Sequence, residues 1–93
     1  MKRYSILHNM EYCYICGCPK ECIHEVYEGR NRQNSIKHGF CIGLCHKHHN
    51  MSDYSVHFDR QLALKIKKEM QKKHEETHSR EEFMCIIGRN YLD

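Results

Sequence analysis

Two short pairs of metal-binding residue types constrain the fold of this chain most. Cys13 and Cys16 are separated by two residues, and Cys45 and His48 repeat the same spacing. A C-x2-C turn can place two thiolates on one ion, and zinc prefers thiolate and imidazole ligands in a tetrahedron. Gly17 supplies the permissive backbone that such a turn favours. The sequence therefore predicts a structural zinc site at Cys13, Cys16, Cys45 and His48.

The sequence leaves alternatives to this ligand set open. Cys18 and Cys22 flank the first pair, and His46 or His49 could replace His48. The chain has 93 residues, of which 40% are hydrophobic, and small domains of this kind usually need disulfides, a metal or a partner subunit. The cysteine count of seven is odd, and no apolar run marks a signal peptide. We therefore expect a cytoplasmic chain with reduced thiols, stabilised by metal.

Residue patterns predict an α+β fold in a single domain over residues 1–93. Residues 21–28 are rich in β-branched and aromatic types and predict a strand, and the apolar run 40–44 predicts its partner. The polar stretch 29–39, bounded by glycines, is expected to be a loop with room for one helical turn. A short helix is expected to begin around 45–48. Residues 1–12 are left without a predicted element.

The part from about 59 to 93 is predicted to be helical. Residues 58–77 contain neither Gly nor Pro and are rich in strong helix formers, with Asp59 as the expected cap. Residues 79–82 match a capping box before a short helix that should stop at Gly88. An apolar stripe recurs every four residues of the long helix and should face the core: Leu62, Ile66 and Met70.

Histidines and asparagines around the metal-binding pairs follow an order that resembles a known family. The relevant segments are Ile23-His24-Glu25-Val26-Tyr27-Glu28-Gly29, Asn31-Arg32, Ser35, Gly39, Leu44-Cys45-x-x-His48-His49 and Val56-His57-Phe58. They resemble the HNH endonucleases, also called His-Me finger or ββα-metal proteins, and above all small phage and prophage members with paired metal-binding motifs. The C-terminal segment Phe83-Met-Cys-Ile-Ile-Gly-Arg-Asn-Tyr-Leu is similar to the end of the same proteins.

The resemblance covers nearly the whole chain and implies a ββα-metal fold with a structural zinc site. The zinc-clamped core would span about 13–58, with a long helix and a short C-terminal helix after it. The implied activity is a metal-dependent endonuclease that hydrolyses DNA phosphodiester bonds, with RNA not excluded as a substrate. The implied location is the cytoplasm of a bacterium or of a phage-infected host cell. No apolar stretch approaches the roughly 20 residues that cross a bilayer, so no membrane partner is expected.

Phosphodiester hydrolysis needs a base that activates water and a cation that stabilises charge on the phosphate. By the family pattern that cation is Mg²⁺ or another divalent ion, distinct from the zinc. Its implied ligands are His24, His49 and His57, with a phosphate contact as the alternative role of His57. Asn31 would orient the base, with Asn34 as the alternative. Glu25 completes the implied catalytic set.

The first strand departs from the family pattern, which usually has Asp-His or His-His where this chain has His24-Glu25. If His24-Glu25 is aligned residue for residue with the family's pair, His24 is a metal ligand and Glu25 stands in the position of the base. A carboxylate with a pKa of about 4.3 is, however, a weak base. Shifted by one residue, His24 is the base and its partner ligand is missing. The alternatives to a nuclease are a zinc-stabilised nucleic-acid-binding module without catalysis, and a zinc-scaffolded protein-interaction module.

The charge of the chain permits a polyanionic partner. The formal net charge is +3 and the isoelectric point is about 8.5, which is compatible with nucleic-acid binding without requiring it. Three basic residues around the 29–39 stretch are the predicted contacts to phosphates: Arg30, Arg32 and Lys37.

Overall fold

A two-stranded antiparallel hairpin lies at the centre of the structure, a computed structural model that describes residues 3–51 and 59–92. Strand β1 (Cys22–Glu25) pairs with β2 (Cys41–Leu44), so that Cys22 lies opposite Leu44 and Glu25 opposite Cys41. The predicted strand pair is confirmed, although β1 is shorter than the expected 21–28. All four residues of β2 are buried, because other segments cover both of its faces.

The connection between the strands is helical, which corrects the predicted loop at 29–39. A 3-10 turn, η1 (Gly29–Asn31), leads directly into helix α1 (Arg32–His38). The helix could not be predicted from this polar sequence, because tertiary contacts rather than local pattern stabilise it. The Ser35 hydroxyl donates to the Tyr27 carbonyl at 2.7 Å and accepts from the Tyr27 N–H at 3.1 Å. Gly39 ends the helix in the left-handed region, with φ of 76°.

The two helices predicted for the second half are confirmed. Helix α2 (Arg60–His74) begins where the Asp59 side chain accepts from the N–H of Leu62, and it ends three residues before the expected 77. Helix α3 (Arg80–Ile87) begins where Ser79 accepts from the N–H of Glu82. Gly88, with φ of 83°, ends it as expected. These caps are local in sequence, so the pattern alone locates them.

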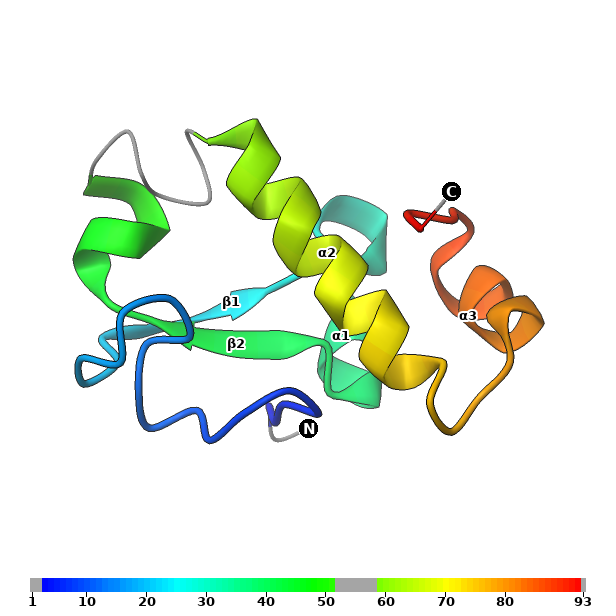
Figure 1. Ribbon diagram of the computed structural model, residues 1–93, viewed down its shortest axis with the longest axis horizontal. Coiled ribbons are helices and arrows are strands. Elements are labelled where there is room, and N and C mark those ends of the chain that lie inside the picture. Colours follow the sequence, from blue (N-terminus) through cyan, green and yellow to red (C-terminus); the bar gives the residue numbers. More distant parts are fainter. Residues whose placement is uncertain (1–2, 52–58, 93) are drawn as a thin grey trace.

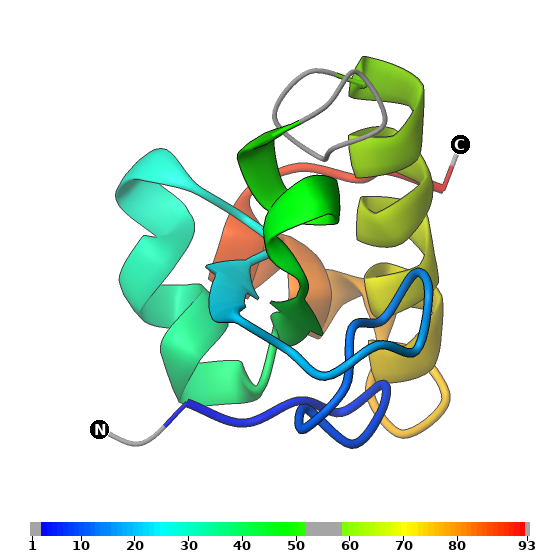
Figure 2. The ribbon, with the colours of Figure 1, turned by 90° about the vertical axis from the view of Figure 1, so that its left-hand side faces the viewer.

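The core lies where the hairpin, α2 and α3 meet. Helix α2 crosses one side of the hairpin in Figure 1, and α1 lies on the other side in Figure 2. Tyr27 forms edge-to-face contacts with Phe40 at 5.4 Å and with Phe83 at 5.5 Å between ring centroids. From the predicted stripe of α2, Ile66 and Met70 are buried, and Leu62 packs half-buried against this cluster.

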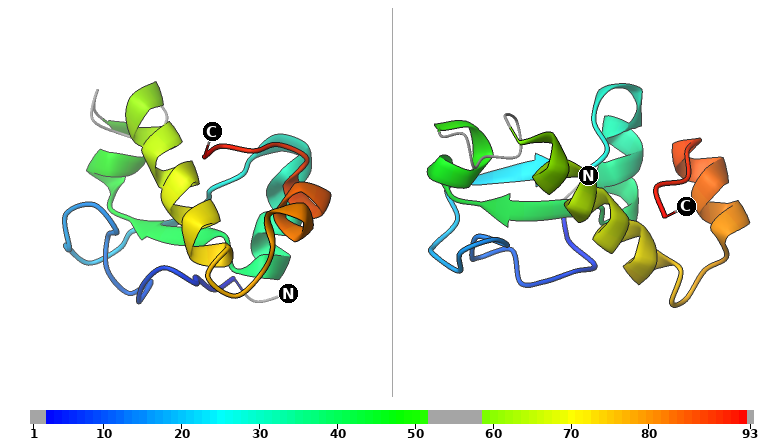
Figure 3. Two further views of the ribbon diagram at one scale, coloured as in Figure 1. Left: turned by 45° about the vertical axis from the view of Figure 1, so that its right-hand side comes forward. Right: turned by 45° about the horizontal axis from the view of Figure 1, so that its top comes forward.

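The N-terminal segment, for which no element was predicted, runs along β2 (Figure 3). It is fixed mainly by backbone hydrogen bonds. The N–H of Ile6 donates to Gly39 at 3.0 Å, and the N–H of Tyr14 donates to Gly43 at 2.8 Å. The Gly43 N–H in turn donates to Nε2 of His8 at 3.2 Å. Gly43 is therefore the point at which the N-terminal segment docks on the sheet.

Replacing Gly43 with alanine is expected to destabilise the protein by about 1–3 kcal/mol, the usual cost of overpacking. A Cβ at this position would lie 2.7 Å from the carbonyl oxygen of Met10 and 2.8 Å from that of Tyr12. Both are backbone atoms, so the N-terminal segment would have to move. Urea unfolding measures the change, with the exposed Gln61→Ala on α2 as a control that should stay within about 0.5 kcal/mol. Equal stabilities of the two variants would contradict this packing.

Acid is expected to destabilise the fold through His74, which is buried against Phe40 and Phe83. Burial, with His78 and His38 nearby, lowers the pKa of His74 below its ordinary value of 6.5. The unfolded chain therefore binds this proton more readily than the folded one. Stability should be complete above pH 6.5 and fall below it, by at most about 1.4 kcal/mol per pH unit for this group.

Urea midpoints measured between pH 8 and pH 5 test this dependence on His74. A His74→Leu variant serves as the comparison, because it cannot take up the proton. Its midpoint should change less with pH than that of the unmodified chain. If the two curves have the same slope, the acid sensitivity arises elsewhere.

Candidate metal centre

The four predicted zinc ligands converge in the structure. The ligand atoms of Cys13, Cys16, Cys45 and His48 all lie within 4.8 Å of one another. The Sγ atoms of Cys16 and Cys45 are 3.7 Å apart, and Sγ of Cys13 lies 3.8 Å from Nδ1 of His48. Four ligands around a zinc ion at about 2.3 Å from each sulfur would have sulfurs about 3.8 Å apart. This Cys3His cluster could therefore bind a metal such as zinc.

Local backbone geometry positions each half of the Cys3His cluster. The first half is a tight turn in which the N–H of Gly17 donates to Cys13 at 2.9 Å, and Gly17 has φ of 78°. In the second half, Cys45 directly follows β2. His48 lies on a π-helical turn, η2 (Lys47–Met51), and its N–H donates to Cys45 at 3.1 Å. The expected short helix after β2 is thus present.

The thiols of the cluster lie in environments suited to metal binding. Burial alone would raise the pKa of Cys13, but N–H groups of Cys45 and Cys16 donate to its sulfur and bring that pKa below its ordinary value. Burial raises the pKa of Cys45. A metal ion would displace the proton there, because a coordinating thiol is deprotonated. Metal binding should therefore depend on pH.

The competing residues are not among the four that converge, although the Cys18 thiol lies close enough to interact with that of Cys16. Cys18 is exposed, and the Cys22 thiol donates to the Leu44 carbonyl at 3.3 Å. His46 is exposed and its Nδ1 lies 3.2 Å from a Glu21 carboxylate oxygen. In the described part of the chain, the Cys3His cluster is the one group of three or more such residues with ligand atoms this close.

His24 and His49 meet next to this cluster. His24 is buried on β1 and His49 is half-buried on η2, and their ring centroids lie 5.6 Å apart with an interplanar angle of 66°. Both line an open pocket of about 350 Å³, together with Glu28 and Arg32. Nε2 of His24 lies 3.9 Å from a carboxylate oxygen of Glu28. The third predicted histidine, His57, lies outside the described residues.

Glu25 is poorly suited to the role of base that its position implies. Its Oε1 accepts from Nε of Arg3 at 3.1 Å and from Nε of Arg32 at 3.2 Å. Burial would raise the pKa of Glu25, but the two guanidinium groups outweigh it and hold this pKa below its ordinary value. A carboxylate stabilised in this way is reluctant to accept a proton. Held in this way, Glu25 is a weaker base than an unpaired glutamate, and its predicted catalytic role stays a prediction.

Asn31 is not among the residues that line the pocket of His24 and His49, and its predicted role of orienting the base stays a prediction. Its Nδ2 donates to the carbonyl of Ile87 at 2.9 Å. The alternative, Asn34, donates in the same way to Ile86 at 2.9 Å. Both amides therefore satisfy the free carbonyls at the C-terminus of α3. A sequence pattern could not reveal this, because the partners lie more than 50 residues apart.

The predicted phosphate contacts are all accessible. Arg30, Arg32 and Lys37 are exposed, as contact with nucleic acid requires. Arg32 is engaged with Glu25 as described. Their role in binding stays a prediction.

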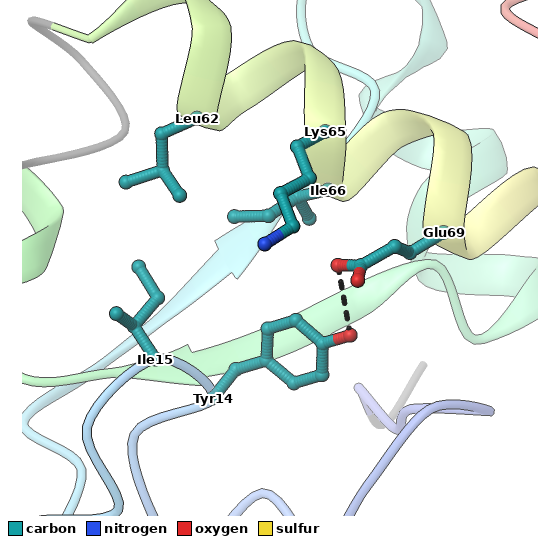
Figure 4. A pocket seen from close by; sticks show the side chains of 6 residues that line it. All are labelled: Tyr14, Ile15, Leu62, Lys65, Ile66 and Glu69. Atoms are coloured by element: carbon teal, nitrogen blue, oxygen red, sulfur yellow. Dashed lines mark hydrogen bonds between the residues drawn. The ribbon is translucent and has the colours of Figure 1, made fainter.

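A contact that sequence reasoning missed joins the metal-binding turn to α2. The Tyr14 hydroxyl donates to Oε1 of Glu69 at 3.0 Å, and Tyr14 and Ile15 face α2 across a pocket of about 320 Å³ (Figure 4). Burial, and then the Glu69 carboxylate, raise the pKa of Tyr14 to about 12. The Cys13–Cys16 turn is therefore held by both the sheet and α2.

Among the helices of residues 3–51 and 59–92, none combines the length and apolar character that crossing a membrane requires. Compared with known proteins, the chain matches no family model, and no curated protein or solved structure is significantly similar to it.

Proposed function

We propose that this chain is a metal-dependent endonuclease of the HNH, or ββα-metal, type that hydrolyses DNA phosphodiester bonds. The observation that carries the proposal is the meeting of His24 and His49 in one open pocket. His24 comes from the first strand and His49 from the helical turn after the second strand, which is the order that the family resemblance implies. The adjacent Cys3His cluster would be the structural zinc site that fixes this arrangement.

The pocket contains groups suited to holding a catalytic divalent cation. His49 offers an imidazole, and Glu28 offers an exposed carboxylate in the same pocket. Such a cation, when bound, would stabilise negative charge on the phosphate and the leaving oxygen. His57 would add a ligand by the family pattern. This pocket is open to solvent, which substrate binding requires.

His24 is the better candidate for the general base. An imidazole can accept a proton near neutral pH, whereas Glu25 is held by Arg3 and Arg32. The carboxylate of Glu28, 3.9 Å from Nε2 of His24, would stabilise the imidazolium that forms after proton transfer. We therefore assign His24 the role of general base and His49 the role of cation ligand.

Cleavage of supercoiled plasmid in Mg²⁺, Mn²⁺ or Ni²⁺ tests the proposal. We expect the unmodified chain to nick or cut the plasmid, and His49→Ala to lower the rate about a hundredfold or more, because a lost cation ligand removes several kcal/mol of charge stabilisation. His46→Ala is the matched control, since His46 is exposed and lies outside the pocket. Cleavage that persists unchanged in His49→Ala would reject the assignment.

The ion pairs of Glu25 favour a second candidate, a nucleic-acid-binding module without catalysis. In that case the position expected for a base has become a structural link between Arg3 and Arg32. Gel shifts that weaken with salt, without any cleavage in the three metals, would support this candidate, because phosphate contacts make binding salt-dependent. Absence of both binding and cleavage would leave the protein-interaction module.

A further inference from the structure

Three histidines surround a second pocket, away from both sites described above. His38 ends α1, His74 ends α2, and His78 lies in the turn that follows α2. All three line a pocket of about 460 Å³, to which Tyr4 and Ile6 of the N-terminal segment also contribute. Neither the proposed nuclease site nor the Cys3His cluster uses any of these residues.

His74 and His78 lie side by side, one helical turn apart. Their rings stack with centroids 4.2 Å apart and an interplanar angle of 7°. The N–H of His78 donates to the carbonyl of His74 at 3.0 Å, so the helical turn continues between them. Two histidines four residues apart on a helical turn can bind one metal ion from the same side. Nδ1 of His78 lies 2.8 Å from the Thr77 hydroxyl, so Nε2 is the ring nitrogen left for a ligand once the ring turns out of this stack.

His74 has a buried nitrogen that lacks a partner. The residue is 5% exposed, and its Nε2 forms no hydrogen bond within the described chain. Buried polar atoms are nearly always paired, so an orphan of this kind calls for a ligand. Burial lowers the pKa of both His74 and His38. These imidazoles are therefore neutral at pH 7, which is the state that binds metal.

We propose that His74 and His78, with His38 as a third ligand, bind a transition-metal ion such as Zn²⁺ or Ni²⁺. Imidazole suits these ions, whereas Mg²⁺ and Ca²⁺ prefer oxygen ligands. The one acidic residue that lines the pocket, Glu76, pairs with Lys73 at 3.2 Å. The three histidines are not as close as the Cys3His ligands, so binding requires the exposed His78 and the half-buried His38 to turn inward. A bound ion would link α1 to the end of α2.

Titration of the protein with NiCl₂, after loading with one equivalent of zinc, tests the site. Calorimetry should show a nickel site whose affinity falls about tenfold or more in His78→Ala and in His38→Ala. Both residues are on the surface of the pocket, so these variants should fold. His46→Ala is the control for an exposed histidine. His49→Ala removes any nickel binding by the pocket of His24 and His49. Both should retain the nickel site.

Paramagnetic broadening in NMR spectra locates the ion. Nickel at this site should broaden signals of Phe40 and Phe83, whose ring centroids lie 5.3 and 5.8 Å from that of His74. Unchanged affinity in His78→Ala, or broadening centred on His24 instead, would overturn the proposal. A failure here leaves the nuclease proposal standing, because that proposal depends on His49 and on cleavage.

Discussion

Removal of metal from the Cys3His cluster is expected to abolish the cooperative unfolding transition of this chain. A metal ion in this cluster would join the Cys13–Cys16 turn to Cys45, which follows β2, and to His48 on η2. Structural zinc contributes about 10–16 kcal/mol of apparent binding free energy in small zinc domains. A domain of this size has a total stability of about 5–15 kcal/mol. The free energy lost with the metal would therefore exceed the stability that the remaining core provides.

Thermal unfolding before and after treatment with a strong chelator measures this effect, with bound zinc quantified by mass spectrometry. Cys13→Ser should reproduce it, because Cys13 is 3% exposed and its sulfur is one of the four converging atoms that could hold the metal. Cys85→Ser is the matched control, since Cys85 is exposed on α3. Cys18→Ser tests the alternative ligand and should keep one zinc per chain. A Cys13→Ser protein with full zinc content and an unchanged melting temperature would refute the assigned ligand set.

Features that are local in sequence were predictable from the sequence alone. The spacing of Cys13-x-x-Cys16 encodes its own turn, and Gly17 completes it. Asp59 and Gly88 mark where helices begin and end, because a cap acts on backbone groups within one helical turn. The two halves of the metal cluster lie far apart in sequence, but the known coordination preference of zinc joins them.

Features that depend on distant partners could not be predicted in the same way. Helix α1 forms within a polar segment because Ser35 bonds to Tyr27 and Ile36 is buried. Asn31 bonds to the end of α3 rather than to the histidine pair. Glu25 is held by Arg3, which lies 22 residues earlier. In each case an ordinary residue type acquires its role from a neighbour that only the tertiary fold supplies.

Replacing His24 is expected to remove most of the cleavage activity, whereas replacing Glu25 is not. His24→Gln keeps the approximate volume of this buried side chain but cannot accept a proton near pH 7. Loss of a general base lowers rates by about 10²–10⁴-fold. Glu25→Gln should change the rate by only a few-fold, because the Glu25 carboxylate is already neutralised by Arg3 and Arg32. Single-turnover cleavage at saturating metal measures both, after zinc content and melting temperature confirm that each variant folds.

The same pair of variants also separates catalysis from binding. Glu25→Gln frees two guanidinium groups near the pocket of His24 and His49, since Arg3 and Arg32 lose a charged partner. DNA affinity should therefore rise in Glu25→Gln and its salt dependence should steepen, because more phosphates can be neutralised. His24→Gln should leave affinity nearly unchanged while cleavage is lost. The opposite result, in which Glu25→Gln loses cleavage and His24→Gln retains it, would transfer the role of base to Glu25. The two arginines would then hold that carboxylate in position.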